Sequence, residues 1–189
     1  MRSPFLIAAG VLAAGQLTLA AVKVHVDVDK TFDFRPVRTW AWEPSPGWVM
    51  AARTPSDDPE AIHRLAEPVV MDAVIAEMSG RGMSHTIDAP DVTLKWYLLL
   101  SLGTESQTLG QFLPPVAQWG IPIFTPSTQS LKVIQQGSLA IDVFAKGVIK
   151  WRGVAAAEIK PGLTQDKRAD LIRVAVREIV KRYPAVKKK

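Results

Sequence analysis

The chain has 189 residues, of which 48% are hydrophobic and 22% are charged, and it contains no cysteine. This length suits one ordinary domain, and the hydrophobic content excludes a chain that is disordered throughout. The missing cysteine excludes disulfides, thiolate nucleophiles, iron–sulfur clusters and cysteine-ligated zinc. The net charge of +5 is concentrated in residues 160–189, where ten Lys or Arg and three Asp or Glu sum to +7, which leaves −2 for the rest of the chain.

Residues 1–20 have the three-part pattern of a secretory signal peptide. Positive charge at Met1 and Arg2 precedes an apolar run over residues 5–14, and Thr18 and Ala20 offer the small side chains that cleavage after residue 20 requires. The run is short for a membrane span, which takes about 20 apolar residues. We therefore expect export and a periplasmic protein; the alternative is an inner-membrane anchor formed by an uncleaved leader.

The first predicted strand covers residues 22–29, where apolar and polar side chains alternate. Such alternation is typical of a strand with one buried face. The apolar face holds Val22, Val24, Val26 and Val28, and the polar face, directed to water or a ligand, holds Lys23, His25, Asp27 and Asp29. A short second strand is expected over residues 39–42, followed by an irregular loop rich in Pro and Gly over residues 43–56.

A helix is predicted to begin at residues 57–60 (DDPE), because Asp caps exposed backbone N–H groups and Pro fits the first helical turn. Apolar residues then recur at helical spacing, and Gly80 and Gly82 supply the left-handed geometry that ends a helix. Residues 91–102 are dense in β-branched, aromatic and apolar side chains. They predict a strand in the middle of the sheet.

Residues 103–130 combine several Pro and Gly with aromatic and aliphatic side chains. A long loop of this kind is uncommon in a compact domain and is often functional. We expect it either to bind a partner through an exposed apolar patch or to fold onto the core of its own domain. The candidate partner-binding residues in this and the preceding Pro-rich loop are Trp48, Phe112, Trp119 and Phe124.

The last third of the chain predicts a β-hairpin and a helix. Strands over residues 138–144 and 148–155 are joined by the three residues Ala145, Lys146 and Gly147, with Gly where positive φ is needed. Thr164 can cap a final helix, which Pro184 stops. These elements predict one α+β domain over residues 21–184, with a mainly antiparallel sheet and two main helices packed on one face.

No motif in the sequence points to catalysis or to a bound cofactor. The strand-to-helix elbow of a serine hydrolase is absent, and glycines 80 and 82 follow a helix, whereas a phosphate-binding loop opens one. His25, His63 and His85 lack the close spacing that places two imidazoles on one metal ion. We therefore expect no catalytic, metal-binding or cofactor-binding residues, and a protein that is not an enzyme.

Several segments together resemble the domain of unknown function 4136 family. They are residues 26–34 (VDVDKTFDF), 39–42 (TWAW), 57–59 (DDP), 81–83 (RGM), 89–94 (APDVTL), 139–143 (LAIDV) and 149–153 (IKWRG). The resemblance implies an exported protein of the bacterial cell envelope, commonly a lipoprotein, with a compact α+β domain and no assigned activity. This chain lacks the cysteine that lipoproteins carry at the end of the leader, so lipid attachment at that position is chemically impossible.

The leading functional hypothesis is a non-enzymatic envelope protein that binds another envelope component or assists its assembly. An alternative is a periplasmic domain that binds a lipid or another small apolar molecule. A hydrolase using His25, Asp27 or Asp29 is a weaker alternative. Residues 185–189 (AVKKK) form a basic C-terminal tail that either contacts an anionic membrane surface or is simply solvated. A nucleic-acid partner is not expected.

Overall fold

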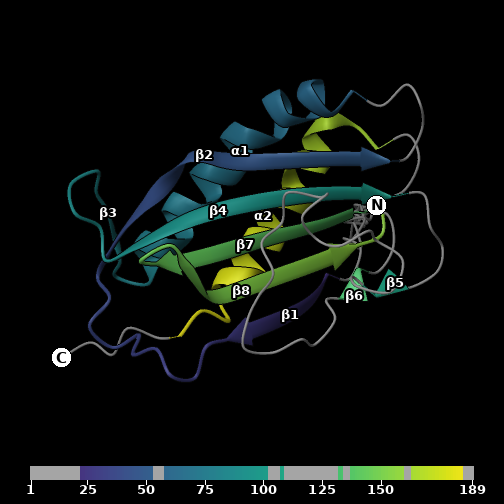
Figure 1. Cartoon of the computed structure of the whole chain (residues 1–189). Helices are drawn as coiled ribbons and strands as arrows, with labels where there is room; N and C mark the ends of the chain where they lie inside the picture. The colour runs from purple at the N-terminus through teal and green to yellow at the C-terminus, as the bar shows by residue number, and fades with distance from the viewer. Residues whose placement is uncertain are drawn as a thin grey trace, which may run out of the picture.

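The computed structural model describes residues 22–52, 58–101, 107–108, 132–133, 137–159 and 163–184 (Figure 1). The expected signal peptide, the basic tail and nearly all of the 103–130 loop lie outside the described residues. The described elements are β1 (Lys23–Val28), β2 (Thr39–Ala52), α1 (Pro59–Gly80), β3 (Ser84–His85), β4 (Val92–Ser101), β5 (Gln107–Thr108), β6 (Lys132–Val133), β7 (Gly137–Ala145), β8 (Val148–Ala157) and α2 (Gln165–Val180).

The main sheet has six strands in the order β1-β8-β7-β4-β2-β3, with both long helices on one face (Figure 1). It is a mixed sheet, so the expectation of a mainly antiparallel sheet is wrong. β1, β8, β7 and β4 pair antiparallel in turn, but β4 pairs parallel with β2, and β2 pairs parallel with β3. The reason is the crossover through α1, which carries the chain back along the sheet so that β4 runs in the direction of β2.

Strand β2 is much longer than the four residues predicted for it. It continues through the expected loop to Ala52, with a register shift opposite β4 between Trp42 and Gly47. Pro44 and Pro46 lie within this irregular stretch. β3 pairs only with Thr39 and Trp40, so the prolines lie on an unpaired edge, where a missing N–H breaks no ladder hydrogen bond.

The hairpin of β7 and β8 is confirmed, but its turn has two residues where three were expected. Ala145 pairs directly with Val148, and the two residues between them both have positive φ, 53° at Lys146 and 72° at Gly147. This is the backbone that a two-residue turn needs in order to follow the twist of its strands. Both helix caps are also confirmed, since the side chains of Asp58 and Thr164 accept hydrogen bonds from Glu60 N and Lys167 N.

The hydrophobic core lies between the sheet and the two helices. Its largest buried side chains are Trp40, Trp96 and Trp151 of the sheet, and the helices add Val74 and Ile179, among others. Gly153 permits α2 to approach the sheet, because a Cβ there would lie 2.3 Å from the Trp151 ring and 2.6 Å from Ile179.

One end of this assembly is the starting point of both helices. β4 and β8 run in the same direction and finish there, and β7 begins there, because Ser138 pairs with both Leu99 and Ala156. α1 and α2 follow β2 and β8 and begin at the same end (Figure 1). The two helices are therefore parallel, and their first turns lie near the C-terminal ends of β2, β4 and β8.

Candidate functional site

Only one of the four aromatic residues predicted to bind a partner can be placed. Trp48 lies on β2 opposite Tyr97 of β4, on the sheet face turned away from the helices, and 45% of it is exposed. Phe112, Trp119 and Phe124 lie outside the described residues. The structure thus supports an accessible aromatic side chain at one position and says nothing of a shared patch.

The three histidines lie on different elements with separate neighbours. His25 Nε2 is 3.4 Å from Asp27 Oδ1 at the surface of β1, His63 stacks on Trp96, and His85 contacts Trp40 edge to face. Within the described residues, no group of three or more His, Asp or Glu side chains is arranged to hold a metal ion.

Asp29 was expected on a polar strand face, but the structure buries it directly after β1. Its carboxylate accepts hydrogen bonds from the Thr31 hydroxyl at 2.6 Å, the Thr31 backbone N–H at 2.9 Å and Lys150 Nζ at 3.0 Å. The hydrogen bonds from Thr31 and then Lys150 lower the pKa of Asp29 to about 2. A carboxylate held in its charged form by three donors is a turn and strand anchor, and it is poorly suited to act as a general base.

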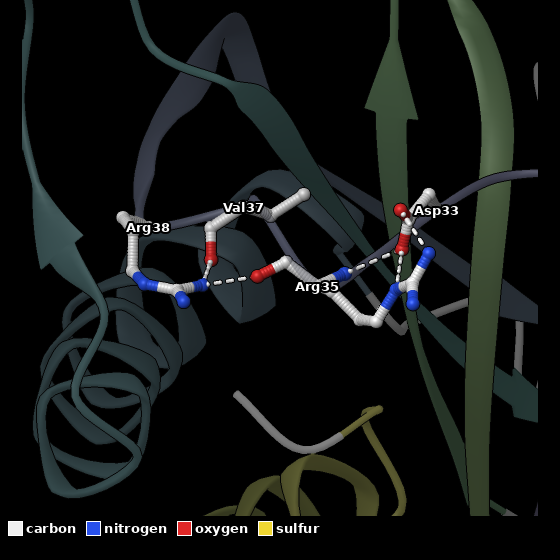
Figure 2. A network of polar contacts seen from close by, with 4 residues as sticks. All are labelled: Asp33, Arg35, Val37 and Arg38. Carbon is white, nitrogen blue, oxygen red and sulfur yellow. Dashed lines mark hydrogen bonds and ion pairs between the residues drawn. The ribbon is translucent and has the colours of Figure 1, made fainter. Parts of the chain in front are cut away.

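The loop between β1 and β2 carries an exposed polar network (Figure 2). The Arg35 guanidinium donates to Asp33, and Arg38 Nη1 donates to the carbonyl oxygens of Arg35 at 2.6 Å and Val37 at 2.8 Å. The hydrogen bonds from Arg35 lower the pKa of Asp33 to about 2. These side chains bind partners within the loop, and the Arg38 backbone N–H donates to Asp91 ahead of β4, so the network orders the chain between the two strands.

Residues of α1, α2 and the sheet line a partly open, mainly apolar pocket of about 400 Å³ at the end where both helices begin. This volume lies within the range of small-molecule sites. α1 contributes Ile62, Leu65 and Val69, and α2 contributes Ala169, Leu171 and Ile172. The floor of the pocket comes from the sheet and includes Leu98, Leu100, Leu139, Ala155 and Ala157.

Among the described residues, the polar side chains directed to this pocket come from α2. They are Gln165, Asp166, Arg168 and Arg173, and all four are exposed. Arg168 Nε donates to the Leu163 carbonyl at 3.1 Å, and Arg173 Nη1 contacts Asp170 at 2.8 Å. Ser138 also borders the pocket, but it pairs with Leu99, so its hydroxyl belongs to the opposite face of the sheet. The pocket therefore has aliphatic walls and one polar side.

The face of the sheet opposite the helices carries a row of alternating charges. Lys95 of β4, Asp142 of β7, Arg152 of β8 and Asp27 of β1 are direct neighbours across four strands. At its centre Arg152 Nε and Nη2 each donate to Asp142 at 2.6 Å, and both residues are buried. Burial opposes the charge on Arg152, but the hydrogen bonds to Asp142 raise its pKa. This is a bidentate ion pair, the geometry in which arginine binds a carboxylate best.

Tyr97 lies beside this pair and is fully buried. Burial raises the pKa of Tyr97, and its hydroxyl forms no hydrogen bond in the described part of the chain. The pair was missed at the level of the sequence. Its signal was a lone acidic residue in one apolar strand, Asp142 within SLAIDVF, and the basic residues Lys150 and Arg152 in the next strand, VIKWRGV. A charged residue in such a strand calls for a partner on a neighbouring strand.

A comparison with protein-family models matches residues 24–185 to the domain of unknown function DUF4136. The chain belongs to this family. A solved DUF4136 protein from Bacteroides thetaiotaomicron is 15% identical, with a TM-score of 0.54 over 86% of this chain and 96% of that one. This likeness concerns the fold, and the DUF4136 name assigns no activity.

Two further solved structures are similar at lower scores. A PDZ domain protein from Parabacteroides distasonis is 16% identical with a TM-score of 0.48, and the chain covers 39% of its length. A PelC dodecamer from Paraburkholderia phytofirmans is 9% identical with a TM-score of 0.39, over 85% of this chain and 95% of that one. A search of curated proteins found no match. Among the described helices, none has the length and apolar content needed to cross a membrane.

Proposed function

We propose that this DUF4136 protein is an exported, non-enzymatic binding protein that holds a small apolar molecule between its helices and its sheet. The pocket of about 400 Å³ carries this proposal. Its walls are aliphatic, and a bound apolar molecule would remove its own surface and theirs from water, which is the main source of affinity at such a site. Export rests on the pattern of residues 1–20 and on the family resemblance.

A blocking substitution tests the pocket. Ala169 lines it from α2, and Ala169→Trp places a large ring in the cavity. The control is Ala76→Trp, which adds the same ring at an exposed position on α1. We expect the fluorescent apolar dye N-phenyl-1-naphthylamine to bind the wild type and Ala76→Trp and to lose most of its binding to Ala169→Trp. Equal dye binding by both variants, with unfolding curves like that of the wild type, would contradict the proposal.

The second candidate function is the recognition of another envelope component, and the exposure of Trp48 favours it. A Trp on an unpaired strand edge offers a large apolar surface with low conformational entropy, and such residues often dominate protein interfaces. A photocrosslinking amino acid at position 48 should then give a discrete adduct in intact cells. The same group at Ile87, which is 87% exposed, is the control. An identical adduct pattern at both positions would count against a Trp48 interface.

A further inference from the structure

The pocket also constrains the chemistry of its ligand, provided that it binds one as proposed above. The side chains that line it are aliphatic apart from the four polar residues of α2, and none of the described lining residues is aromatic. A polar group inserted among the aliphatic walls would lose its water without gaining a partner, at a cost of several kcal/mol. The inserted part of the ligand must therefore be apolar, and its polar part must lie on the α2 side.

The charges at that side favour an anionic head group. Arg173 is paired with Asp170, and Asp166 lies in the first turn of α2, where the helix N-terminus stabilises a carboxylate. Arg168 differs, because its side-chain hydrogen bond among the described residues goes to a neutral acceptor, the carbonyl oxygen of Leu163. That bond uses Nε and holds the guanidinium beside the pocket. Its Nη groups remain as donors for a ligand, and a guanidinium binds a carboxylate or a phosphate through such paired donors.

We infer that the pocket binds an anionic single-chain amphiphile, with its alkyl chain between α1, α2 and the sheet and its carboxylate or phosphate on Arg168. The aliphatic walls accept the chain, and the cation at the mouth accepts the head group. A neutral amphiphile of the same length would fill the same cavity without this contact. A cationic amphiphile would lack this contact and would be repelled by the positive charge of Arg168.

The test compares four probes with the same twelve-carbon chain: dodecanoate, dodecyl phosphate, dodecan-1-ol and dodecyltrimethylammonium. Their affinities are measured below their micellar concentrations, by displacement of the dye and by native mass spectrometry. The protein variants are the wild type, Arg168→Gln, Arg168→Lys and Arg182→Gln. The last removes the same charge two residues beyond the C-terminal end of α2, at a residue that does not line the pocket.

We expect at least one of the two anions to bind the wild type about tenfold tighter than dodecan-1-ol, the usual worth of a hydrogen bond to a charged group. The preference should disappear in Arg168→Gln, persist in part in Arg168→Lys, persist fully in Arg182→Gln and weaken with added salt. Thermal unfolding checks that Arg168→Gln is folded. Equal affinities for alcohol and anions, or an undiminished anion preference in Arg168→Gln, would overturn the inference while leaving the apolar pocket intact. Failure of all four probes to bind the wild type would overturn the proposed function as well.

Discussion

The face of the sheet under α1 and α2 is built from apolar side chains, whereas the opposite face carries a row of charges. Under the helices, the rings of Trp96 and Trp151 pack with aliphatic residues, and apolar contact has no strict direction. On the opposite face, Asp142 and Arg152 contact each other through two hydrogen bonds with fixed geometry. Packing on the helix-covered face therefore tolerates local gaps, and one of these gaps forms the pocket. On the charged face, by contrast, Asp142 and Arg152 each rely on the other for compensation of a buried charge.

The charged face should give the largest loss when one partner is removed. Asp142→Ala removes the carboxylate that accepts two hydrogen bonds from the buried guanidinium of Arg152, and we expect the free energy of unfolding to fall by about 3 kcal/mol. Urea unfolding followed by circular dichroism measures it. The double variant Asp142→Leu with Arg152→Met removes both charges and should recover most of the loss. A single variant within 1 kcal/mol of the wild type would show that the pair contributes little.

The helix-covered face should respond most to added volume where it is already tight. Gly153→Ala puts a methyl group 2.3 Å from the Trp151 ring and 2.6 Å from Ile179, so these packed side chains, or α2 with them, must shift. We expect a destabilisation of about 3 kcal/mol, at the upper end for an overpacked core. Urea unfolding again measures it. An unchanged stability would mean that α2 is not held tightly against β8.

The edge of the charged face should make stability depend on acid pH through Asp29. Its pKa is about 2 in the folded protein against 3.8 as the ordinary value, so the folded state favours the charged carboxylate. The resulting contribution, on the order of 2 kcal/mol, is fully present above about pH 4 and is lost as the pH falls toward 2. The difference in unfolding free energy between wild type and Asp29→Asn should shrink across this interval. Thr31→Val removes the strongest hydrogen-bond donor to Asp29, so the unfolding free energy of this variant should change less with pH than that of the wild type. If the difference between wild type and Asp29→Asn does not depend on pH, Asp29 does not make stability depend on acid pH.

The smallest change in stability is expected at a glycine that packs against neither face of the sheet. Gly80 is the last residue of α1, and positive φ is found at Gly82 and not at Gly80, contrary to the left-handed geometry expected for both. Gly80 is exposed and has no atom within 4 Å of an added Cβ. Gly80→Ala should stabilise the protein by about 0.5 kcal/mol, because alanine restricts the unfolded chain and favours the helix. A small rise in the melting temperature is the expected signal. Gly80→Ala should therefore raise stability while Gly153→Ala lowers it. The same substitution would then report backbone entropy at the open position and steric overlap at the crowded one.

Much of the fold could be predicted because its signals are local. Asp58 and Thr164 cap the two helices through contacts two and three residues away, and the turn at Lys146 and Gly147 closes neighbouring strands. The direction and length of β2 could not be predicted in this way. Pro44 and Pro46 argue against a strand unless the neighbours are known. Only the pairings of β2 show that β3 stops at Trp40 and that the prolines lie in the stretch without partners on β4.

The sequence by itself determined the family, the α+β class, the starts of both helices and the hairpin, since each depends on nearby residues or on a pattern spread along the chain. Tertiary structure alone decided the mixed sheet, the Asp142–Arg152 pair and the apolar pocket. The pocket walls come from α1, β4, β7, β8 and α2, and no spacing along the chain records that these segments meet. Such sites depend on contacts distant in sequence, which arise only when the helices and strands pack together.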